Sequence, residues 1–494
     1  MAGIGFELKK LFVGRGAIRK VRAYAYASIV CSGTMLLAVL LLLGIEQMAK
    51  WTGTPEHERE ILIVMLVYAL LFSLVLSSFL QTLLSRYVAD MLYREEPERV
   101  MPSLIGGSLT LMIPGGAIYA LLLSRAGEIP LFDRMINWAL FMELIPVWLQ
   151  MAYITAAKDY RRILQVFALG VALAFLSGGI LLAVGIRALR ALMIALFLGY
   201  GSMAVGFIAV LLRYFPTGKG GAFAFVEWFG ETPELIWIGF LSMAGAFVHL
   251  ILMWFSPLGA VITGPFRQAS THDVAAFFAF LVTLPTNINF VVSVEVNFYQ
   301  KYRRYFDAIT GGGTLREIGI ARENMVTSLK QEVFKLIQIQ LFCMVVYIVL
   351  MRYFLKTIGF TTDMTGMFQV MSIGYSAYAI GNSMMLLQLY FNDRTGALLT
   401  AGAFFGVNLA VTALTMNGAP VYFGVGLCAA GFVMYVVGIA RLFYYVRRID
   451  YHVFCAQPVL LQERKGFWAR LAARLGERTG RPARRAGETK EMQA

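Results

Sequence analysis

Long apolar stretches recur along the chain between about residues 23 and 446, and short polar segments separate them. Each stretch holds about 20 residues, which is the length a helix needs to cross a hydrocarbon core of about 30 Å. The stretches lack the alternating ten-residue pattern of barrel strands, and helices are the other structures that satisfy all backbone groups in lipid. The pattern predicts an all-α polytopic membrane protein with twelve spans, at residues 23–45, 61–84, 103–124, 135–156, 163–185, 191–212, 235–255, 275–294, 333–354, 365–391, 397–416 and 421–446.

Basic residues gather on alternate connections between these stretches. Most of the 43 Lys and Arg residues lie at the two ends of the chain and in the connections after the even-numbered spans. Basic residues in short loops are retained on the cytoplasmic side of the membrane. The pattern therefore predicts that the N-terminus and the C-terminus are both cytoplasmic.

The composition supports this class of protein. Hydrophobic residues make up 59% of the chain, more than soluble domains contain. The net charge of +14 lies mostly beside the membrane on the cytoplasmic side, where each basic residue gains about 1 kcal/mol from anionic lipids. We therefore expect anionic lipids, and no nucleic acid, as partners of the basic surface. The four cysteines have no close spacing typical of a metal site or redox pair.

The organisation of the chain is predicted to be two six-helix lobes with amphipathic ends. Residues 1–22 form a cytoplasmic amphipathic helix, and residues 447–494 form a basic cytoplasmic tail with a helix on the inner membrane face. The N-lobe occupies residues 23–215, and the C-lobe occupies residues 216–446 with a cytoplasmic loop at 295–332. Parallel six-helix repeats of this kind are a common plan of transporters, with the substrate path between them.

No motif predicts resident chemistry. The sequence has no Gly-x-x-x-x-Gly-Lys-Ser/Thr phosphate loop, no His-Glu-x-x-His pair and no Gly-x-Ser-x-Gly elbow. The Gly311–Gly313 run lacks the lysine of a phosphate loop and is interpreted as a flexible turn. We expect no catalytic residue, no metal ligand and no cofactor, and transport is the function that remains.

Four segments carry a resemblance to a known family. They are residues 1–8 (MAGIGFEL), residues 254–257 (WFSP), residues 294–299 (VEVNFY) with Tyr302 and Arg303, and residues 311–315 (GGGTL) with Ile318, Ala321 and Arg322. Together they resemble the PelG family of Pel exopolysaccharide transporters over residues 1 to about 450.

The resemblance implies a fold, a location and partners. It implies a twelve-helix member of the multidrug/oligosaccharidyl-lipid/polysaccharide exporter superfamily in the bacterial inner membrane. It also implies three partners, namely the Pel glycosyltransferase that elongates the polymer from a UDP-sugar, and the membrane proteins PelD and PelE, of which PelD senses cyclic di-GMP.

Polar residues inside the spans are the candidates for a translocation path, since a charge at the bilayer centre costs at least about 2.5 kcal/mol. Glu143 lies three residues before Pro146, and Gln150 follows on the same helix face. A bent helix could present both to a cavity. The alternative is a protonated or amide-paired Glu143 that only holds helices together.

The eighth span supplies a second group. Pro285 opens the helix, Asn287 and Asn289 follow, and Glu295 and Tyr299 lie near the inner end. These side chains form either a polar wall toward the cytoplasm or, for Glu295, a structural ion pair with Arg303 or Arg304.

Further candidates are weaker. Arg86 and Asp90, at positions i and i+4, are predicted to form an ion pair that either caps the second span or acts as a gate. Four further polar residues either line the path or form hydrogen bonds between helices: His249, Asn382, Gln388 and Asn408. Three aromatic residues either stack on sugars or mark the lipid interface: Trp148, Tyr153 and Trp254.

The hypothesis at this point is an inner-membrane transporter of a Pel-like, hexosamine-containing polysaccharide that works with a cytoplasmic synthase. A cation-coupled exporter of small molecules, a lipid-linked oligosaccharide exporter and a membrane scaffold for the glycosyltransferase complex remain as alternatives.

Overall fold

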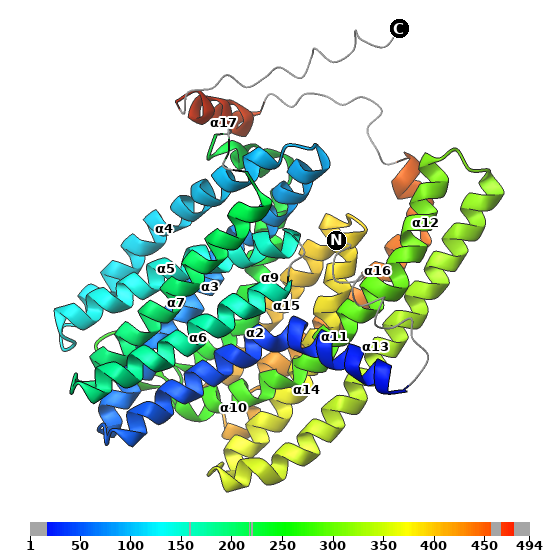
Figure 1. Cartoon of the computed structure of the whole chain (residues 1–494). Helices are drawn as coiled ribbons and strands as arrows, with labels where there is room; N and C mark the ends of the chain where they lie inside the picture. The colour runs from blue at the N-terminus through cyan, green and yellow to red at the C-terminus, as the bar shows by residue number, and fades with distance from the viewer. Residues whose placement is uncertain (1–16, 158–159, 217, 219–220, 456–465, 479–494) are drawn as a thin grey trace.

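The computed structural model describes residues 17–157, 160–216, 218, 221–455 and 466–478. These residues are almost all helical (Figure 1). The first six long helices are α2 (Ala17–Trp51), α3 (Glu56–Tyr93), α4 (Val100–Ser124), α5 (Leu131–Ala157), α6 (Tyr160–Ala183) and α7 (Ala188–Tyr214). The second group comprises α9 (Glu234–Met253), α10 (Ser270–Phe280), α11 (Leu284–Val291), α12 (Tyr299–Thr310), α13 (Leu315–Thr357), α14 (Thr362–Tyr390), α15 (Arg394–Thr415) and α16 (Val425–Arg447).

Short elements connect the long helices. They are the 3-10 turns η1 (Pro97–Arg99), η2 (Ala224–Glu227), η3 (Leu281–Thr283) and η5 (Pro420–Tyr422), the π-helical turns η4 (Val292–Phe298) and η6 (Tyr451–Cys455), the helices α8 (Trp228–Glu231) and α17 (Phe467–Arg478), and the strands β1 (Ala260–Thr263) and β2 (Phe266–Gln268). The α10–η3–α11–η4–α12 series runs as one broken helix through the eighth predicted span.

The predicted spans are confirmed as long helices. Within the described residues, eleven helical segments are long and apolar enough to cross a membrane. The remaining predicted span, at residues 365–391 and tenth in order, is α14, whose 29 residues reach about 44 Å at 1.5 Å per residue. Helix α14 is not among the eleven because it is less apolar. It carries four buried polar residues, namely Ser372, Ser376, Ser383 and Gln388. The chain is thus a multi-pass membrane protein.

Each group of six passes packs mainly within itself. In the first group α7 packs on α5 and α6, α3 packs on α5, and α2 packs on α6. In the second, α16 packs on α14 and α15, and α15 packs on α9. Small residues allow close approach in this second group, because a Cβ on Gly431 would lie 2.3 Å from the Gly374 carbonyl oxygen. The two groups meet through α3 on α9 and α2 on α11.

The segment predicted as a cytoplasmic loop at 295–332 is not a loop. Helix α12 continues the eighth pass, a turn with Gly312 at φ +72° follows, and α13 begins at Leu315. The Thr314 hydroxyl accepts from the Glu317 N–H at 3.3 Å while the Glu317 carboxylate accepts from the Thr314 N–H at 2.8 Å, which fixes the start of α13. The two helices form a pair that projects from the bundle (Figure 1).

The described part of the tail contains the predicted amphipathic helix as α17. This helix packs on η2 and α8, which link the two groups of passes. The rings of Trp468 and Phe229 lie 5.3 Å apart in an edge contact. Helix α17 therefore contacts protein as well as presenting its other face outward, whereas the sequence favoured lipid contact alone. The amphipathic helix predicted at 1–22 lies mostly outside the described residues.

Candidate functional site

A cavity of about 520 Å³ lies between the two groups of passes. Helix α3 of the first group forms one wall, and α9, the α11–α12 region, α14 and the start of α15 form the others. Its polar lining residues are Ser78, Gln81, Thr82, Ser85, Arg86, Ser242, Tyr299, Tyr390, Asn382, Asn392 and Arg394. The volume falls in the range of about 300–1,000 Å³ that is typical of ligand sites.

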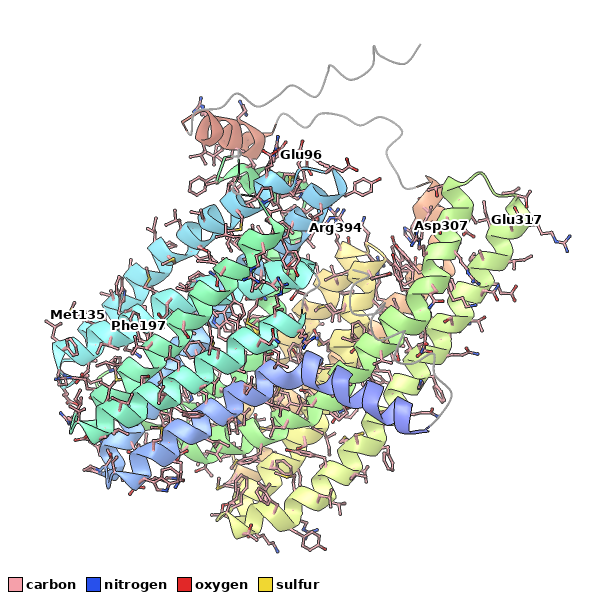
Figure 2. All side chains as sticks on the ribbon, viewed as in Figure 1. Glu96, Met135, Phe197, Asp307, Glu317 and Arg394 are labelled. Atoms are coloured by element: carbon pink, nitrogen blue, oxygen red, sulfur yellow. The ribbon has the colours of Figure 1, made fainter. Side chains whose placement is uncertain are left out.

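The cavity lies toward the cytoplasmic end of the bundle. Its lining comes from the second half of α3, the first half of α9 and the end of α14, all of which the basic-residue pattern assigns to the cytoplasmic side. Figure 2 shows Arg394 between the two groups of helices at the end of the molecule where Glu96 also lies. The structure thus has a polar-lined recess that faces the cytoplasm.

An ion pair borders this recess, as the sequence predicts. Arg86 Nε lies 3.0 Å from Asp90 Oδ1. Asp90 Oδ2 also accepts a hydrogen bond from Trp228 Nε1 at 3.0 Å, so the linker helix α8 is attached to the end of α3. On the other side, Arg394 donates to the Glu231 carbonyl oxygen at 3.3 Å and to Asn392 Oδ1 at 3.1 Å. Helix α8 therefore joins the two groups at the cavity mouth.

The opposite end of the passage is closed by contacts between the two groups. The antiparallel pair β1–β2 follows α9 and reaches across to α3 and to the turn between α4 and α5. Thr263 Oγ1 donates to Glu128 Oε2 at 2.7 Å. The Tyr68 hydroxyl both accepts from the Arg267 N–H at 3.0 Å and donates to the Arg267 carbonyl oxygen at 3.1 Å. The structure is thus closed outward and recessed inward.

Two histidines lie buried behind this closure. His249 Nε2 shares a hydrogen bond with the Tyr375 hydroxyl at 3.0 Å, and its ring centroid lies 5.2 Å from that of His272. Both ring nitrogens of His272 are buried without a hydrogen-bond partner among the described residues. His272 Nδ1 lies 3.7 Å from Asp273 Oδ1, beyond hydrogen-bond distance.

Glu143 and Gln150 lie on α5 inside the first group of passes, away from the residues that line the cavity. A carboxylate oxygen of Glu143 approaches α7, 3.2 Å from where a Cβ on Gly201 would be. Glu143 Oε1 and Gln150 Oε1 are both buried without a hydrogen-bond partner in the part of the chain that the structure describes. The predicted pair therefore does not join the inter-lobe cavity in this arrangement.

The candidate residues predicted on the eighth pass have different surroundings. Tyr299 lines the cavity, Asn287 is exposed, and Asn289 Nδ2 donates to the Pro285 carbonyl oxygen at 2.9 Å. Glu295 lies in η4, and its side chain is outside the described part of the structure. Arg303 pairs with Asp307 at 3.4 Å, and Arg304 is exposed. Figure 2 shows Asp307 near the projecting end of the α12–α13 pair.

Other polar candidates bind helices together. Gln388 donates to the Gly438 carbonyl oxygen at 3.0 Å and accepts from Thr400 at 3.1 Å, and Asn408 donates to the Gly245 carbonyl oxygen at 2.7 Å. Asn382, by contrast, lines the cavity.

Two of the three aromatic side chains that the sequence singled out for sugar stacking, Tyr153 and Trp254, are buried. Tyr153 is 0% exposed and hydrogen-bonds Ser103, while Trp254 is 2% exposed and stacks on Tyr68. Trp148 is partly buried, and its Nε1 donates to Ser73 Oγ at 3.0 Å.

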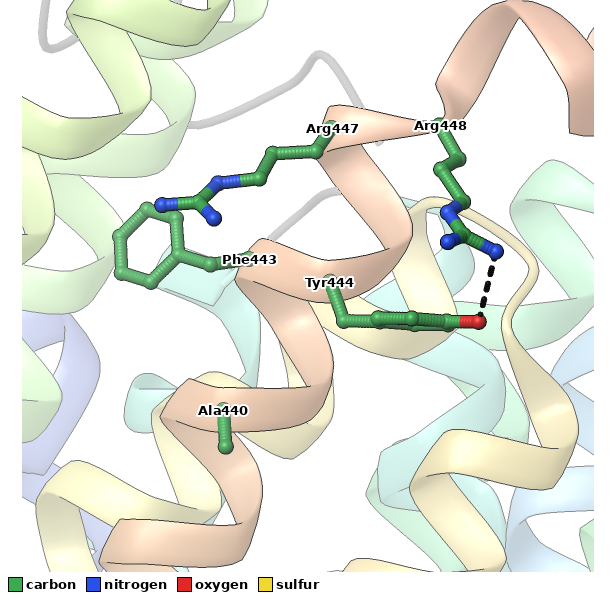
Figure 3. Close-up of a pocket in the computed structure, with 5 residues that line it drawn as sticks. All are labelled: Ala440, Phe443, Tyr444, Arg447 and Arg448. Atoms are coloured by element: carbon green, nitrogen blue, oxygen red, sulfur yellow. Dashed lines mark hydrogen bonds between the residues drawn. The ribbon is translucent and has the colours of Figure 1, made fainter.

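A second recess of about 380 Å³ lies on α16 near its cytoplasmic end (Figure 3). Arg448 donates to the Tyr444 hydroxyl at 2.9 Å, and its guanidinium lies 4.7 Å from the ring centroid. All five lining residues lie between positions 440 and 448. This recess is a groove along one helix and does not connect the two groups of passes.

Sequence reasoning missed Arg394 and the small polar residues of α3 and α9. Gln81, Thr82 and Ser85 lie near the inner end of an otherwise apolar span, next to the predicted Arg86, so their clustering was the available signal. In the sequence, nothing distinguishes Arg394 from other charged residues at the start of a helix.

Solved structures with a similar fold are transporters. The chain aligns with a MATE crystal structure in the bent conformation (12% identity, 91% of this chain and 100% of that chain, TM-score 0.59). It also aligns with an outward-facing multidrug resistance MATE family transporter of the MOP superfamily (12%, 91% and 99%, TM-score 0.57). A third neighbour is the MATE transporter ClbM in complex with Rb⁺ (14%, 90% and 97%, TM-score 0.57). At these identities the likeness shows the fold alone.

Among curated proteins, none matches the chain. The family PelG, described as "Putative exopolysaccharide Exporter (EPS-E)", matches residues 1–454. This range includes all twelve passes and ends at the tail. The chain is therefore a multi-pass inner-membrane protein that belongs to the PelG family of exopolysaccharide exporters.

Proposed function

We propose that the chain exports a Pel-like, hexosamine-containing polysaccharide through the passage between its two lobes, at residues 23–215 and 216–446. The observation that carries the proposal is the cavity between α3, α9 and α14, which is recessed from the cytoplasm while its outer end is closed. Its lining mixes hydroxyl and amide groups with apolar side chains, and sugars present both kinds of surface. The family membership supports the same class of substrate.

The polymer enters from a cytoplasmic synthase in this proposal. The α12–α13 pair projects on the cytoplasmic side and carries exposed charges of both signs, including Arg303, Asp307 and Glu317 (Figure 2). A projecting helix pair of this kind suits a protein partner, and we assign it to the Pel glycosyltransferase with PelD and PelE. The outward face of α17 carries Arg470 and Arg474, and we assign it to anionic lipids.

The polymer passes without a chemical step on this chain. Its synthesis pushes it outward from the cytoplasm, or the lobes alternate between two arrangements. In the second case the Arg86–Asp90 pair is the element that breaks and re-forms at the inner mouth, because it joins α3 to the linker through Trp228.

A second candidate function is cation-coupled export of small molecules. Glu143 favours it, because one of its carboxylate oxygens is buried without a partner among the described residues. Structural neighbours include a multidrug resistance transporter and one in complex with Rb⁺. This candidate requires export without any synthase.

The experiment fills the cavity by substitution. Ser242→Trp places an indole in the cavity, while Ser177→Trp, at a half-buried serine of α6 that does not line the cavity, is a matched control. Polymer is measured inside and outside the inner membrane of cells whose own copy is deleted, together with the synthase in the membrane fraction. The proposal predicts that only Ser242→Trp stops export and that the synthase stays in the membrane. Normal export with Ser242→Trp would contradict the conduit and favour a scaffold.

A further inference from the structure

We infer that α12 and the end of α14 carry an aromatic subsite that binds successive sugar rings of a glycan as it enters the cavity. The subsite consists of Tyr299, Tyr302 and Phe306 on α12 and Tyr390 on α14. The inference rests on the proposed export function and adds the place and the mode of sugar binding. It also assigns a role to α12 that neither the family nor the sequence motifs supply.

Three of the rings form a continuous series, and Tyr299 lies one turn before Tyr302 on α12. Tyr299 and Tyr390 line the cavity. The Tyr302 ring centroid lies 4.6 Å from that of Tyr390 and 4.6 Å from that of Phe306. On α12 the three residues fall at positions i, i+3 and i+7, so they share one helix face and advance about 10 Å along the axis. The series leads from the cavity wall along the projecting helix.

Partial exposure separates these rings from the structural aromatic residues beside them. Phe298 and Tyr305 are both 0% exposed, and the Tyr305 hydroxyl donates to Asp450 at 2.8 Å. They fix α12 against α14 and the end of α16. Tyr299, Tyr302, Phe306 and Tyr390 are half-buried. Tyr302, Phe306 and Tyr390 pack with one side against the core that contains Phe298 and Tyr305, which holds them in place, and their remaining exposed surface is what we assign to a ligand.

The chemistry matches a neutral or weakly charged glycan. The face of an aromatic ring is electronegative and apolar, and the C–H face of a pyranose ring is apolar with slightly positive hydrogens. Stacking of this kind tolerates any register, so a polymer can advance from ring to ring without breaking charged contacts. A small molecule confined to the cavity would contact Tyr299 and Tyr390 but would not need Tyr302 and Phe306. The extension of the series along α12, away from the cavity, therefore indicates a polymer chain.

The test measures binding of a soluble N-acetylhexosamine oligosaccharide to the full chain in lipid nanodiscs. Tyr302→Ala is compared with Tyr302→Phe, which keeps the ring, and with Tyr444→Ala in the separate α16 groove (Figure 3). We expect roughly tenfold weaker binding for Tyr302→Ala, as expected for the loss of one stacking contact, and wild-type binding for the other two. Wild-type binding by Tyr302→Ala, or equal losses in Tyr302→Ala and Tyr444→Ala, would overturn the subsite.

Polymer export by the same variants separates this inference from the proposed function. If Ser242→Trp stops export and Tyr302→Ala exports normally, the conduit stands and the aromatic subsite is wrong. If Ser242→Trp exports normally, the conduit itself is wrong.

Discussion

The aromatic ring of Tyr68 stacks on that of Trp254, with centroids 4.6 Å apart and planes at 11°. Tyr68 lies on α3 in the first group of passes, and Trp254 ends α9 in the second. Trp254 Nε1 also donates to Asp273 Oδ2 at 3.0 Å, which ties the stack to α10. Passage of a polymer between the two groups requires that this contact separate.

The hairpin contact at Gly264 is expected to control the outer closure. Gly264 has a φ of +51°, and a Cβ there would lie 2.9 Å from the Arg125 carbonyl oxygen and from Ala126 Cα. Gly264→Ala therefore strains the hairpin and pushes it from the α4–α5 turn. We expect faster labelling of an introduced Ala269→Cys by an impermeant maleimide added from outside. Gly53→Ala, which also has a positive φ but meets no neighbour, is the control, and equal labelling in both backgrounds would contradict the closure.

Glu143→Gln tests whether transport needs an ionisable group in the first lobe. If Glu143 couples export to a cation, the substitution lowers polymer export several-fold and leaves the amount of protein in the membrane unchanged. Glu58→Gln, which removes a carboxylate from the surface pair with Arg187, serves as the control. Unchanged export by Glu143→Gln would exclude an obligatory charge at this position.

The linker carboxyl Glu227 gives a pH-dependent prediction. Glu227 is exposed as a residue, but partial desolvation of its carboxyl by the surrounding linker raises its pKa, and the neighbouring Glu231 carboxylate raises that pKa further. The ionised form therefore destabilises the folded protein at neutral pH, and this cost disappears as the pH falls below the usual carboxyl range. Glu227→Gln is expected to raise the melting temperature at pH 7 and not at pH 4. Glu98→Gln, at another surface glutamate, should leave both values unchanged. A neutral-pH melting temperature for Glu227→Gln equal to wild type would contradict the argument.

The ion pair between Asp393 and Arg441 is expected to stabilise the second lobe. Asp393 is 4% exposed, accepts two hydrogen bonds of 2.8 Å from Arg441 and caps α15 through the Gly396 N–H. Asp393→Ala removes the cap of α15 and leaves Arg441 without its partner; because the Arg441 side chain is 28% exposed, the cost stays below the about 3–5 kcal/mol of a fully buried pair. Thermal unfolding in detergent should show a large decrease in melting temperature. Arg303→Ala, which breaks the exposed pair with Asp307, should change it little.

The number and order of the passes could be predicted from the sequence because lipid imposes a length and an apolar composition on each helix. The same dependence on apolar composition explains why the helices within residues 295–332 were not predicted. The first turns of α13 are charged and lie outside an apolar span. A local signal was present, because Thr314 and Glu317 have the spacing of a capping box that begins a helix. Hydropathy alone thus misses helices that continue into water.

The candidate site was predictable only in part. Arg86, Tyr299 and Asn382 were predicted because they are polar residues in or at the inner ends of spans, and all three line the cavity. Gln388 looks similar in sequence but binds α14 to α15 and α16, because its direction depends on how these helices pack. The meeting of α3 with α9 and α14 is a tertiary property with no short-range pattern. Arg394 and the aromatic series on α12 therefore required the structure.

The measurement that tests the conduit most directly is a reversible cross-link across the outer closure. Thr263 and Glu128 belong to different lobes, and their side chains are hydrogen-bonded at 2.7 Å. A Thr263→Cys/Glu128→Cys variant, in a background with the native cysteines replaced, can therefore be oxidised to join the lobes. Each single-cysteine variant, oxidised in the same way, is the control. We predict that oxidation stops polymer export and reduction restores it, whereas undiminished export through the cross-linked protein would contradict passage between the lobes.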